Sequence, residues 1–240
     1  MLDIVVPVYN EDKGILRLLD EIKCEIHMKK RVIVVYDFEG DATLPVIKTY
    51  KSTYPFEINL IRNQLGCGAL NAILTGIKYA SAEMVLVMMA DSSDRLDVVD
   101  LMCKHMQRGY DLVCGSRYMK GGSQHGGPFL KGLFSRAAGI SLHYFTKIPT
   151  HDCTNSFKLY RKSMLEQIQI ESSGGFEIGL EITVKAYIKG FKIIEVPSEW
   201  SERENGESNF HMWKWLPHYL HWYLYCIWMY WTGKNRKLRL

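Results

Sequence analysis

Short apolar runs alternate with amphipathic stretches along the first half of this 240-residue chain. Five runs rich in β-branched residues are predicted to be strands, at residues 3–8, 31–36, 57–61, 84–89 and 112–114. Stretches with apolar residues at helical spacing separate several of them, at residues 14–28, 69–80 and 98–106. This alternation predicts an α/β fold, in which helices flank both faces of a mostly parallel, Rossmann-like nucleotide-binding sheet.

The second half of the chain is less regular. A helix is predicted at residues 129–145 and a last strand at residues 192–196. Beyond Pro197 the composition changes, because all six tryptophans stand at or after Trp200 and the chain ends in GKNRKLRL. We therefore expect one domain over residues 1–210, followed by an aromatic and basic helical tail over residues 211–240.

Composition and charge narrow the possible classes of protein. With 47% hydrophobic and 23% charged residues, the chain can bury the core of one large domain. The net charge of +4 is mild and the basic residues are dispersed except near the C-terminus, so no nucleic-acid partner is expected. None of the six cysteines forms a CxxC pair, and residues 2–8 have the pattern of a strand and not of a signal peptide. We expect a reducing compartment and a cytosolic catalytic face.

Polar residues follow three of the predicted strands. In parallel sheets ligands bind beyond the carboxyl ends of the strands, so these residues are where chemistry is expected. The first strand ends in PVYNE, the second in Asp37 and the fourth in ADSSD. Asp91, in ADSSD, is a candidate ligand for a divalent metal held against a diphosphate. The alternative is that Asp91 and Asp94 cap a helix that begins near Arg95.

Several motifs occur in a fixed order along the chain: PVYNE, NQLGCGALNAILTGIKYASAEMVLVMMAD, GSRYMKGG, HDCTNSFKLYRK, GFEIGLEITVKAYIKGFKIIEVPSEWSER and GESNF. They cover almost all of residues 1–210, and the set resembles family 2 glycosyltransferases. In pattern the chain is most similar to dolichol-phosphate mannose synthases and bacterial polyprenyl-phosphate glycosyltransferases. The resemblance implies a GT-A fold, to which this chain adds a C-terminal aromatic amphipathic helical segment.

For the donor, the resemblance implies a base and ribose pocket lined by Pro7, Tyr9, Glu11 and Asp37. It also implies that Asp91 belongs to a DxD-type motif that holds Mg²⁺ or Mn²⁺ on the donor diphosphate. The chain departs from the family here, since Met89 stands where the first Asp of Asp-Ala-Asp is usual. We expect Ser93 to join Asp91 as a metal ligand. Asp94 is an alternative source of a ligand oxygen, and the spacing of the residues does not decide between the two.

For the acceptor, Arg117 in GSRY resembles the arginine that the family places near the acceptor phosphate. A guanidinium can grip a phosphate through two parallel hydrogen bonds. We expect Lys131 and Ser135 on the next helix, and Arg203 in SERENGES, to bind the same phosphate; the alternative is a solvated basic face. Asp152 matches an acidic position of the family and is assigned a catalytic role, with loop capping as the alternative.

These implications predict an inverting, metal-dependent hexosyltransferase whose catalytic residues are Asp91, Arg117 and Asp152. The expected donor is GDP-mannose or a UDP-hexose, and the expected acceptor is dolichyl or undecaprenyl phosphate. Two alternatives stay open. One is a family 2 transferase that glycosylates a saccharide hydroxyl in cell-surface glycan synthesis, and the other is a catalytically silent homologue that serves as a scaffold.

The aromatic tail bears on where the protein works. It is nearly long enough to span a bilayer, but Lys214, Pro217, His218 and His221 interrupt it, and Trp and Tyr prefer the headgroup boundary. We expect an amphipathic segment that lies in the interface at the cytoplasmic face of a membrane, with its basic end attracted to anionic lipid. The alternative is an aromatic helix folded back on the domain or buried in a homo-oligomer.

Overall fold

The computed structural model describes residues 1–202 and 212–233. For residues 131 and 212–214 it describes the backbone and not the side chain. A seven-stranded sheet has the strand order β3-β2-β1-β4-β7-β5-β8, and a two-stranded sheet pairs β6 with β9. The strands are β1 (Leu2–Val8), β2 (Lys30–Tyr36), β3 (Glu57–Arg62), β4 (Met84–Val87), β5 (Leu112–Ser116), β6 (Ser123–His125), β7 (Lys158–Arg161), β8 (Ile193–Pro197) and β9 (Glu199–Ser201).

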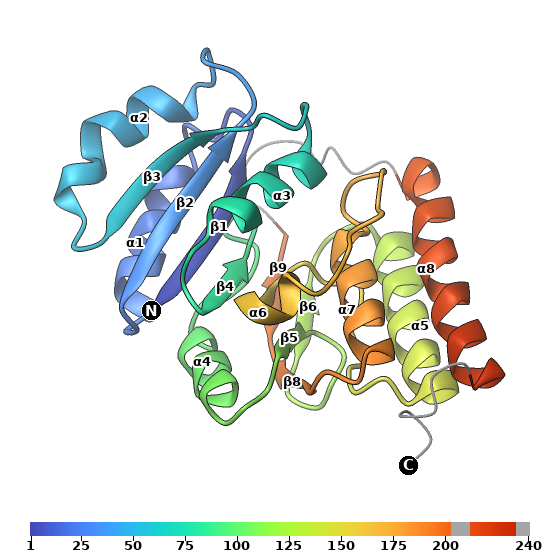
Figure 1. The fold of residues 1–240 in the computed structure, drawn as a ribbon. Coiled ribbons are helices and arrows are strands. Elements are labelled where there is room, and N and C mark those ends of the chain that lie inside the picture. The colour runs from blue at the N-terminus through green and yellow to red at the C-terminus, as the bar shows by residue number, and fades with distance from the viewer. Residues whose placement is uncertain (203–211, 234–240) are drawn as a thin grey trace.

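Helices flank the large sheet and extend beyond it on the side of β5 and β8 (Figure 1). They are α1 (Ile15–Glu25), α2 (Thr43–Tyr50), α3 (Ala69–Tyr79), α4 (Val99–Gln107), α5 (Phe129–Thr146), α6 (Lys162–Leu165), α7 (Ile178–Ile188) and α8 (Met212–Thr232), with a short 3₁₀ turn η1 at Lys51–Thr53. The expected α/β architecture is therefore confirmed.

The centre of the sheet forms because its strands are apolar on both faces. Every residue of β1 is buried, and β1 runs parallel to β2 and β4, as expected for a strand covered by helices on both sides. All pairings in the large sheet are parallel except those of β7, which runs antiparallel to β4 on one side and β5 on the other. Strand β7 therefore begins at the edge of the sheet where β4 and β5 end.

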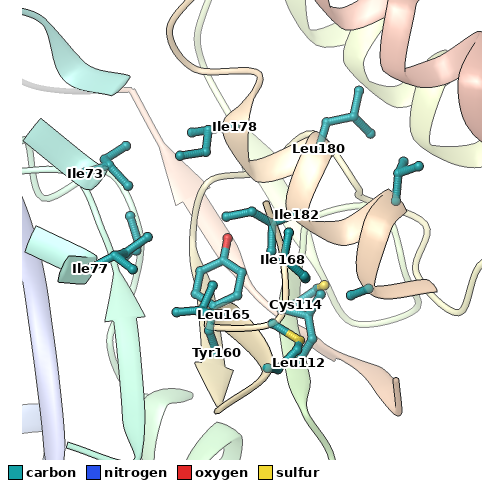
Figure 2. Close-up of a cluster of buried hydrophobic side chains, with 14 of the residues drawn as sticks. Ile73, Ile77, Leu112, Cys114, Tyr160, Leu165, Ile168, Ile178, Leu180 and Ile182 are labelled. Carbon is teal, nitrogen blue, oxygen red and sulfur yellow. The ribbon is translucent and has the colours of Figure 1, made fainter. Parts of the chain in front are cut away.

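A hydrophobic core lies on each face of the sheet, because successive side chains of a strand point to opposite sides. Within β1, Val5 packs into the core on the side of α3 and α7, whereas Val6 packs into the core on the side of α1 and α4. Figure 2 shows part of the first core, with Ile77 of α3, Tyr160 of β7 and Ile182 of α7 gathered around one centre.

Every strand and helix predicted from the sequence is present, with ends that differ by a few residues. The elements that were not predicted are α2, β6, β7, α6, α7 and β9. Helix α7 was missed because all of its residues except Lys185 are buried, so it has no polar face and no helical periodicity to detect. Three strands were missed because they are too short to show alternation of apolar and polar residues. Strands β6 and β9 have three residues each, and β7 has four.

Helix α8 packs along α5 and α7 (Figure 1). Trp222 and Cys226 are buried in the core on the α7 side of the sheet, and the Lys185 ammonium lies 4.7 Å from the centre of the Trp222 ring. The Tyr223 hydroxyl lies 2.8 Å from Ser141 Oγ of α5. Residues 212–233 therefore form an aromatic helix that folds back on the domain, as the second expectation for the tail had it.

The outer side of α8 is nevertheless apolar. His221 is exposed on this helix, and the exposed large hydrophobic residues of the helix are Leu216, Leu220, Leu224, Trp228 and Trp231. They recur at intervals of three or four residues and so form one stripe along the helix. No helix within residues 1–202 and 212–233 is both long and apolar enough to cross a bilayer. The basic residues expected to accompany the tail, Lys234, Arg236, Lys237 and Arg239, are outside the described residues.

Candidate active site

The loop after β1, which carries PVYNE, is held in place by the loop after β2. Asn10 has a left-handed backbone, with φ of 54°. Its backbone N–H donates to Asp41 Oδ2 over 3.1 Å, and its side-chain Oδ1 accepts from the N–H of Ala42 over 3.1 Å. The backbone N–H of Glu11 donates to Thr43 Oγ1 over 2.9 Å. Buried Asp41 therefore shapes the loop expected to bind the donor, a role that the sequence analysis did not assign to it.

Two of the residues expected to line the base pocket differ in exposure. Pro7 is buried inside β1, whereas the Tyr9 side chain at the strand end is 58% exposed. The Tyr9 ring meets the ring of Phe38 edge to face, with 5.8 Å between centroids. Phe38 follows β2, so the carboxyl ends of two neighbouring strands present an open aromatic surface. Such a surface suits the flat face of a nucleobase.

Asp37 is fixed by the loop that precedes α3. Its carboxylate accepts from the Asn63 side-chain amide and from the backbone N–H of Gly68, each over 2.8 Å. Asn63 is buried and also donates to the carbonyl of Gly66 over 2.6 Å, while its oxygen accepts from the Thr75 hydroxyl over 3.0 Å. The signal for Asn63 was present in the sequence, since it opens the NQLGCG motif, but its contact with Asp37 spans 26 residues.

ADSSD forms a tight turn after β4. Asp91 Oδ1 accepts from the backbone N–H of Ser93 over 3.2 Å, and Ser92 has φ of 52°. The alternative in which Asp91 and Asp94 cap a helix near residue 95 is wrong, because α4 begins at residue 99. The turn is instead anchored to β9, since Ser93 O accepts from a backbone N–H of that strand over 2.8 Å.

Buried polar atoms without a hydrogen-bond partner gather in this turn. Among the described residues they include Ser92 Oγ, Ser93 Oγ and Asp94 Oδ1. Each such atom costs about 1–3 kcal/mol if nothing binds it, and more if it is charged. Burial first, and then the nearby Asp91 carboxylate, raise the pKa of Asp94 to about 7, while the Arg117 guanidinium acts in the opposite direction. The turn therefore holds two mutually repelling carboxylates and unsatisfied oxygens.

These oxygens fit a divalent metal of the kind that is shared with a substrate. Within residues 1–202 and 212–233, no three His, Cys, Asp or Glu side chains are grouped closely enough to hold a metal ion by themselves. Mg²⁺ is, however, usually bound by one or two carboxylates together with substrate phosphates and water. Asp91, Ser93 and Asp94 offer oxygen ligands of this type.

Arg117 and Asp152 form a buried ion pair beyond β5. Arg117 Nε and Nη2 donate to the two carboxylate oxygens of Asp152 over 2.7 and 2.9 Å, and the backbone N–H of Arg117 donates to Oδ2 over 3.0 Å. The side chains are 11% and 0% exposed. Burial disfavours the charged guanidinium, but the Asp152 carboxylate outweighs burial, and the pKa of Arg117 is raised. This geometry suits a carboxylate that positions Arg117 more than one that accepts a proton.

Ser135 of α5 joins this pair. Its Oγ accepts from Arg117 Nη2 over 3.0 Å and lies 2.6 Å from the Thr154 hydroxyl. The structure thus brings together Arg117 and Ser135, both expected at the acceptor phosphate, with Asp152, which was expected to be catalytic. Lys131 lies on the same helix, but its side chain is outside the described part, and Arg203 lies outside the described residues altogether.

Asn155 links the acidic turn to the arginine, a connection that the sequence did not reveal. Its side-chain amide donates to Gly115 O of β5 over 3.1 Å, and Asn155 lies near enough to Asp94 to lower the pKa of that carboxyl. The segment 198–201, which includes β9, anchors both the acidic turn and the end of β5, since Ser198 N–H donates to Ser116 O over 3.0 Å and Ser201 N–H donates to Ser93 O over 2.8 Å. The metal-ligand candidates and the phosphate-binding candidate therefore adjoin one site.

A family model described as "Glycosyl transferase family 2" matches residues 3–169 of this chain. The chain is 30% identical over 212 residues to dolichol-phosphate mannosyltransferase from Pyrococcus furiosus, a match that covers 86% of this chain and 58% of that protein. It is 25% identical over 213 residues to polyprenol monophosphomannose synthase from Mycolicibacterium smegmatis, covering 85% of this chain and 79% of that protein. The chain thus spans little more than half the length of the Pyrococcus relative.

A likeness to solved structures concerns the fold. Glucosyl-3-phosphoglycerate synthase from Mycobacterium tuberculosis, solved in complex with Mg²⁺ and uridine diphosphate, aligns with a TM-score of 0.69 at 14% identity. The alignment covers 95% of this chain and 79% of that one. The same enzyme has also been solved with Mn²⁺. The likeness confirms the expected GT-A arrangement of the sheet and its helices.

Proposed function

Because the chain belongs to glycosyl transferase family 2, we propose that it moves a hexose from a nucleotide sugar to a polyprenyl phosphate. The names of the two relatives, a dolichol-phosphate mannosyltransferase and a polyprenol monophosphomannose synthase, support this acceptor. GDP-mannose and a UDP-hexose are the donors we propose to test. The open aromatic surface of Tyr9 and Phe38 would receive the base, beside Glu11 and Asp37.

The observation that carries the proposal is that one segment anchors both the acidic turn and the strand end before Arg117. Ser201 N–H donates to Ser93 O over 2.8 Å, and Ser198 N–H donates to Ser116 O over 3.0 Å. An acidic turn suits a metal-bound diphosphate, and an arginine suits a phosphate. Their adjacency would bring the anomeric carbon of the donor and the acceptor phosphate together, which is the main requirement of a transfer reaction. Bound Mg²⁺ or Mn²⁺ would neutralise the charge that develops on the departing diphosphate, and we propose Asp91 and Ser93 among its ligands.

The engaged state of Asp152 supports a phosphate acceptor over a hydroxyl acceptor. A phosphate monoester has a second pKa near 6 and is already ionised at neutral pH, so its oxygen can attack without a base. A saccharide hydroxyl would need a carboxylate within hydrogen-bond reach to remove its proton. Asp152 instead accepts three hydrogen bonds from Arg117. Attack from the face opposite the leaving diphosphate would invert the anomeric carbon.

Arg117 retains donors for a phosphate despite its pairing. Asp152 occupies the edge formed by Nε and Nη2, and none of the hydrogen bonds among the described residues uses Nη1. We propose that Nη1 and the Ser135 hydroxyl meet the acceptor phosphate, with Lys131 and Arg203 as further cations. Asp152 would then act by holding the guanidinium in one orientation.

Exposed apolar side chains support a lipid acceptor. Besides the stripe on α8, helix α5 exposes Phe129, Leu130, Leu133, Phe134, Tyr144 and Phe145. Four of these lie in the first two turns of α5, close along the helix to Ser135. A monomeric domain rarely exposes so many large apolar residues on two adjacent helices without a partner. We propose that α5 and α8 rest on a membrane surface and keep the acceptor phosphate within reach.

The test is a transfer assay with GDP-mannose and a panel of UDP-hexoses, a short-chain polyprenyl phosphate and Mn²⁺. We expect sugar to appear on the lipid phosphate, and the Asp91→Asn variant to lose at least nine-tenths of the rate. Transfer to free saccharides but not to the lipid would replace this proposal with the saccharide acceptor. Absence of transfer and of donor hydrolysis with every donor would favour the scaffold alternative.

A further inference from the structure

Met89 removes one carboxylate from the metal motif, and the turn that follows contains a carboxylate in a different position. A thioether is a soft ligand and a poor partner for Mg²⁺ or Mn²⁺, which prefer carboxylate, carbonyl and water oxygens. Asp94 stands five residues later at the end of the turn, and its buried Oδ1 has no hydrogen-bond partner among the described residues. We propose that Asp94 replaces the missing acid as a direct ligand of the metal, together with Asp91 and Ser93.

Buried oxygen atoms that lack a hydrogen-bond partner support this inference. Asp94 is 6% exposed and its Oδ1 has no partner, and Ser93 is 5% exposed and its Oγ has no partner. Two adjacent residues with buried, unsatisfied oxygens are rare, because native structures pair nearly all such groups. A divalent cation would bind both oxygens and would also relieve the repulsion between the carboxylates of Asp91 and Asp94.

The surroundings of Asp94 fit a ligand that is held in advance. The backbone on both sides of it is fixed to β9, because Ser93 O accepts from Ser201 N–H over 2.8 Å and Arg95 N–H donates to Glu199 O over 3.1 Å. The Asn155 amide lies near the Asp94 carboxylate and favours its ionised form, while Oδ1 has no hydrogen-bond partner among the described residues. Metal-binding carboxylates are commonly oriented by such outer hydrogen bonds.

This inference rests on the proposed function, because the protein supplies too few ligands alone and the nucleotide diphosphate must complete the site. It predicts that Mn²⁺ binds weakly to the free protein and more tightly when UDP or GDP is present. If Asp91 and Ser93 were the only protein ligands, Asp94 would contribute nothing to that affinity.

The experiment measures Mn²⁺ affinity by electron paramagnetic resonance, with the full chain and saturating UDP or GDP. We expect Asp94→Asn to weaken Mn²⁺ binding at least tenfold, because mutating even a residue that only orients a metal ligand typically costs about 10–100-fold in affinity. The matched control is Asp97→Asn, an acid in the same segment whose exposed carboxylate pairs with Arg95, and its Mn²⁺ affinity should stay within twofold of wild type. Circular dichroism of each variant checks that the fold is retained.

A second variant tests whether the carboxylate at position 94 takes the place of one at position 89. Met89→Asp combined with Asp94→Asn restores the usual family pattern and should recover Mn²⁺ affinity relative to Asp94→Asn. A folded Asp94→Asn protein that binds Mn²⁺ within twofold of wild type overturns the inference and leaves the proposed function standing. Wild-type protein that binds neither UDP nor GDP with Mn²⁺ overturns the proposed donor, and the inference with it.

Discussion

Replacing Asp152 with alanine should destabilise the protein strongly, because it strands the Arg117 guanidinium in a buried position. The Arg117 side chain is only 11% exposed, and Asp152 provides the acceptors for its Nε, Nη2 and backbone N–H. Removing one partner of a buried ion pair typically costs about 3–5 kcal/mol. Among the described residues, Ser135 Oγ is the only other hydrogen-bond acceptor of this guanidinium, and a neutral hydroxyl cannot balance its charge.

The expected loss of stability comes from the unpaired charge that remains buried, and not from the loss of the ion pair itself. Replacing both partners of a buried ion pair by apolar residues is often neutral or even stabilising. The double variant Arg117→Met, Asp152→Ala should therefore recover much of the stability that Asp152→Ala loses. The double-mutant cycle is expected to give a coupling of about 2–3 kcal/mol, at the upper end for residues in direct contact. Both variants should lose transfer activity, because either change removes the oriented guanidinium.

Equilibrium unfolding in urea, followed by tryptophan fluorescence and far-ultraviolet circular dichroism, measures these differences. All six tryptophans stand at or after Trp200, so circular dichroism is needed to report on the sheet. The control is Asp97→Ala, whose partner Arg95 is 58% exposed, and it should cost less than about 1 kcal/mol. An Asp152→Ala protein within about 1 kcal/mol of wild type, or a coupling near zero, would refute the reasoning.

Three further variants test other contacts. Gly76→Ala should destabilise the protein by about 1–3 kcal/mol in the same urea assay, because the new methyl would lie 2.3 Å from Val5 Cγ1, and overpacking outweighs the gain in helix propensity. Tyr9→Ala should weaken nucleotide-sugar binding by about 1–3 kcal/mol in calorimetry without lowering Tm, since its ring is exposed; unchanged affinity would remove it from the base pocket. Leu220→Asp, on the exposed stripe of α8, should reduce sedimentation with anionic liposomes and leave Tm unchanged, whereas undiminished sedimentation would exclude the stripe from membrane contact.

The sequence predicted the fold well where burial is one-sided or the run of apolar residues is long. Strand β1 and helix α1 are examples, since α1 buries Ile15, Leu18, Leu19 and Ile22 on one face. Helix α7 shows the limit, because a helix buried on all sides has no period that distinguishes it from other apolar segments. The packing of α8 on α5 and α7 was also left open, since an aromatic stripe fits both a protein core and a membrane interface.

The candidate site was predicted as separate residues and not as a set of contacts. Arg117 and Asp152 were both singled out, but their pairing across 35 residues could not be read from either motif. Asp41, Asn63 and Asn155 were not singled out at all, because each acts through hydrogen bonds to residues far along the chain. Such contacts depend on the order of strands in the sheet, which local spacing does not specify.

The insertion of β7 explains why those contacts meet at one place. Strand β7 separates β4 from β5, so the ends of those strands lie two strand spacings apart, about 9–10 Å. Because β7 is antiparallel, its first residue, Lys158, pairs with the last residue of β4, and the segment leading into it enters between the two ends.

That segment contains Asp152, which pairs with Arg117, and Asn155, whose amide donates to Gly115 O and lies near Asp94. Fully buried Lys158 anchors it by donating to the carbonyls of Cys153 and Asn155. A parallel strand at this position would begin at the opposite edge of the sheet and would carry its leading segment away from the site. The antiparallel direction of β7 therefore explains why the acidic turn after β4 and Arg117 after β5 lie beside the same segment.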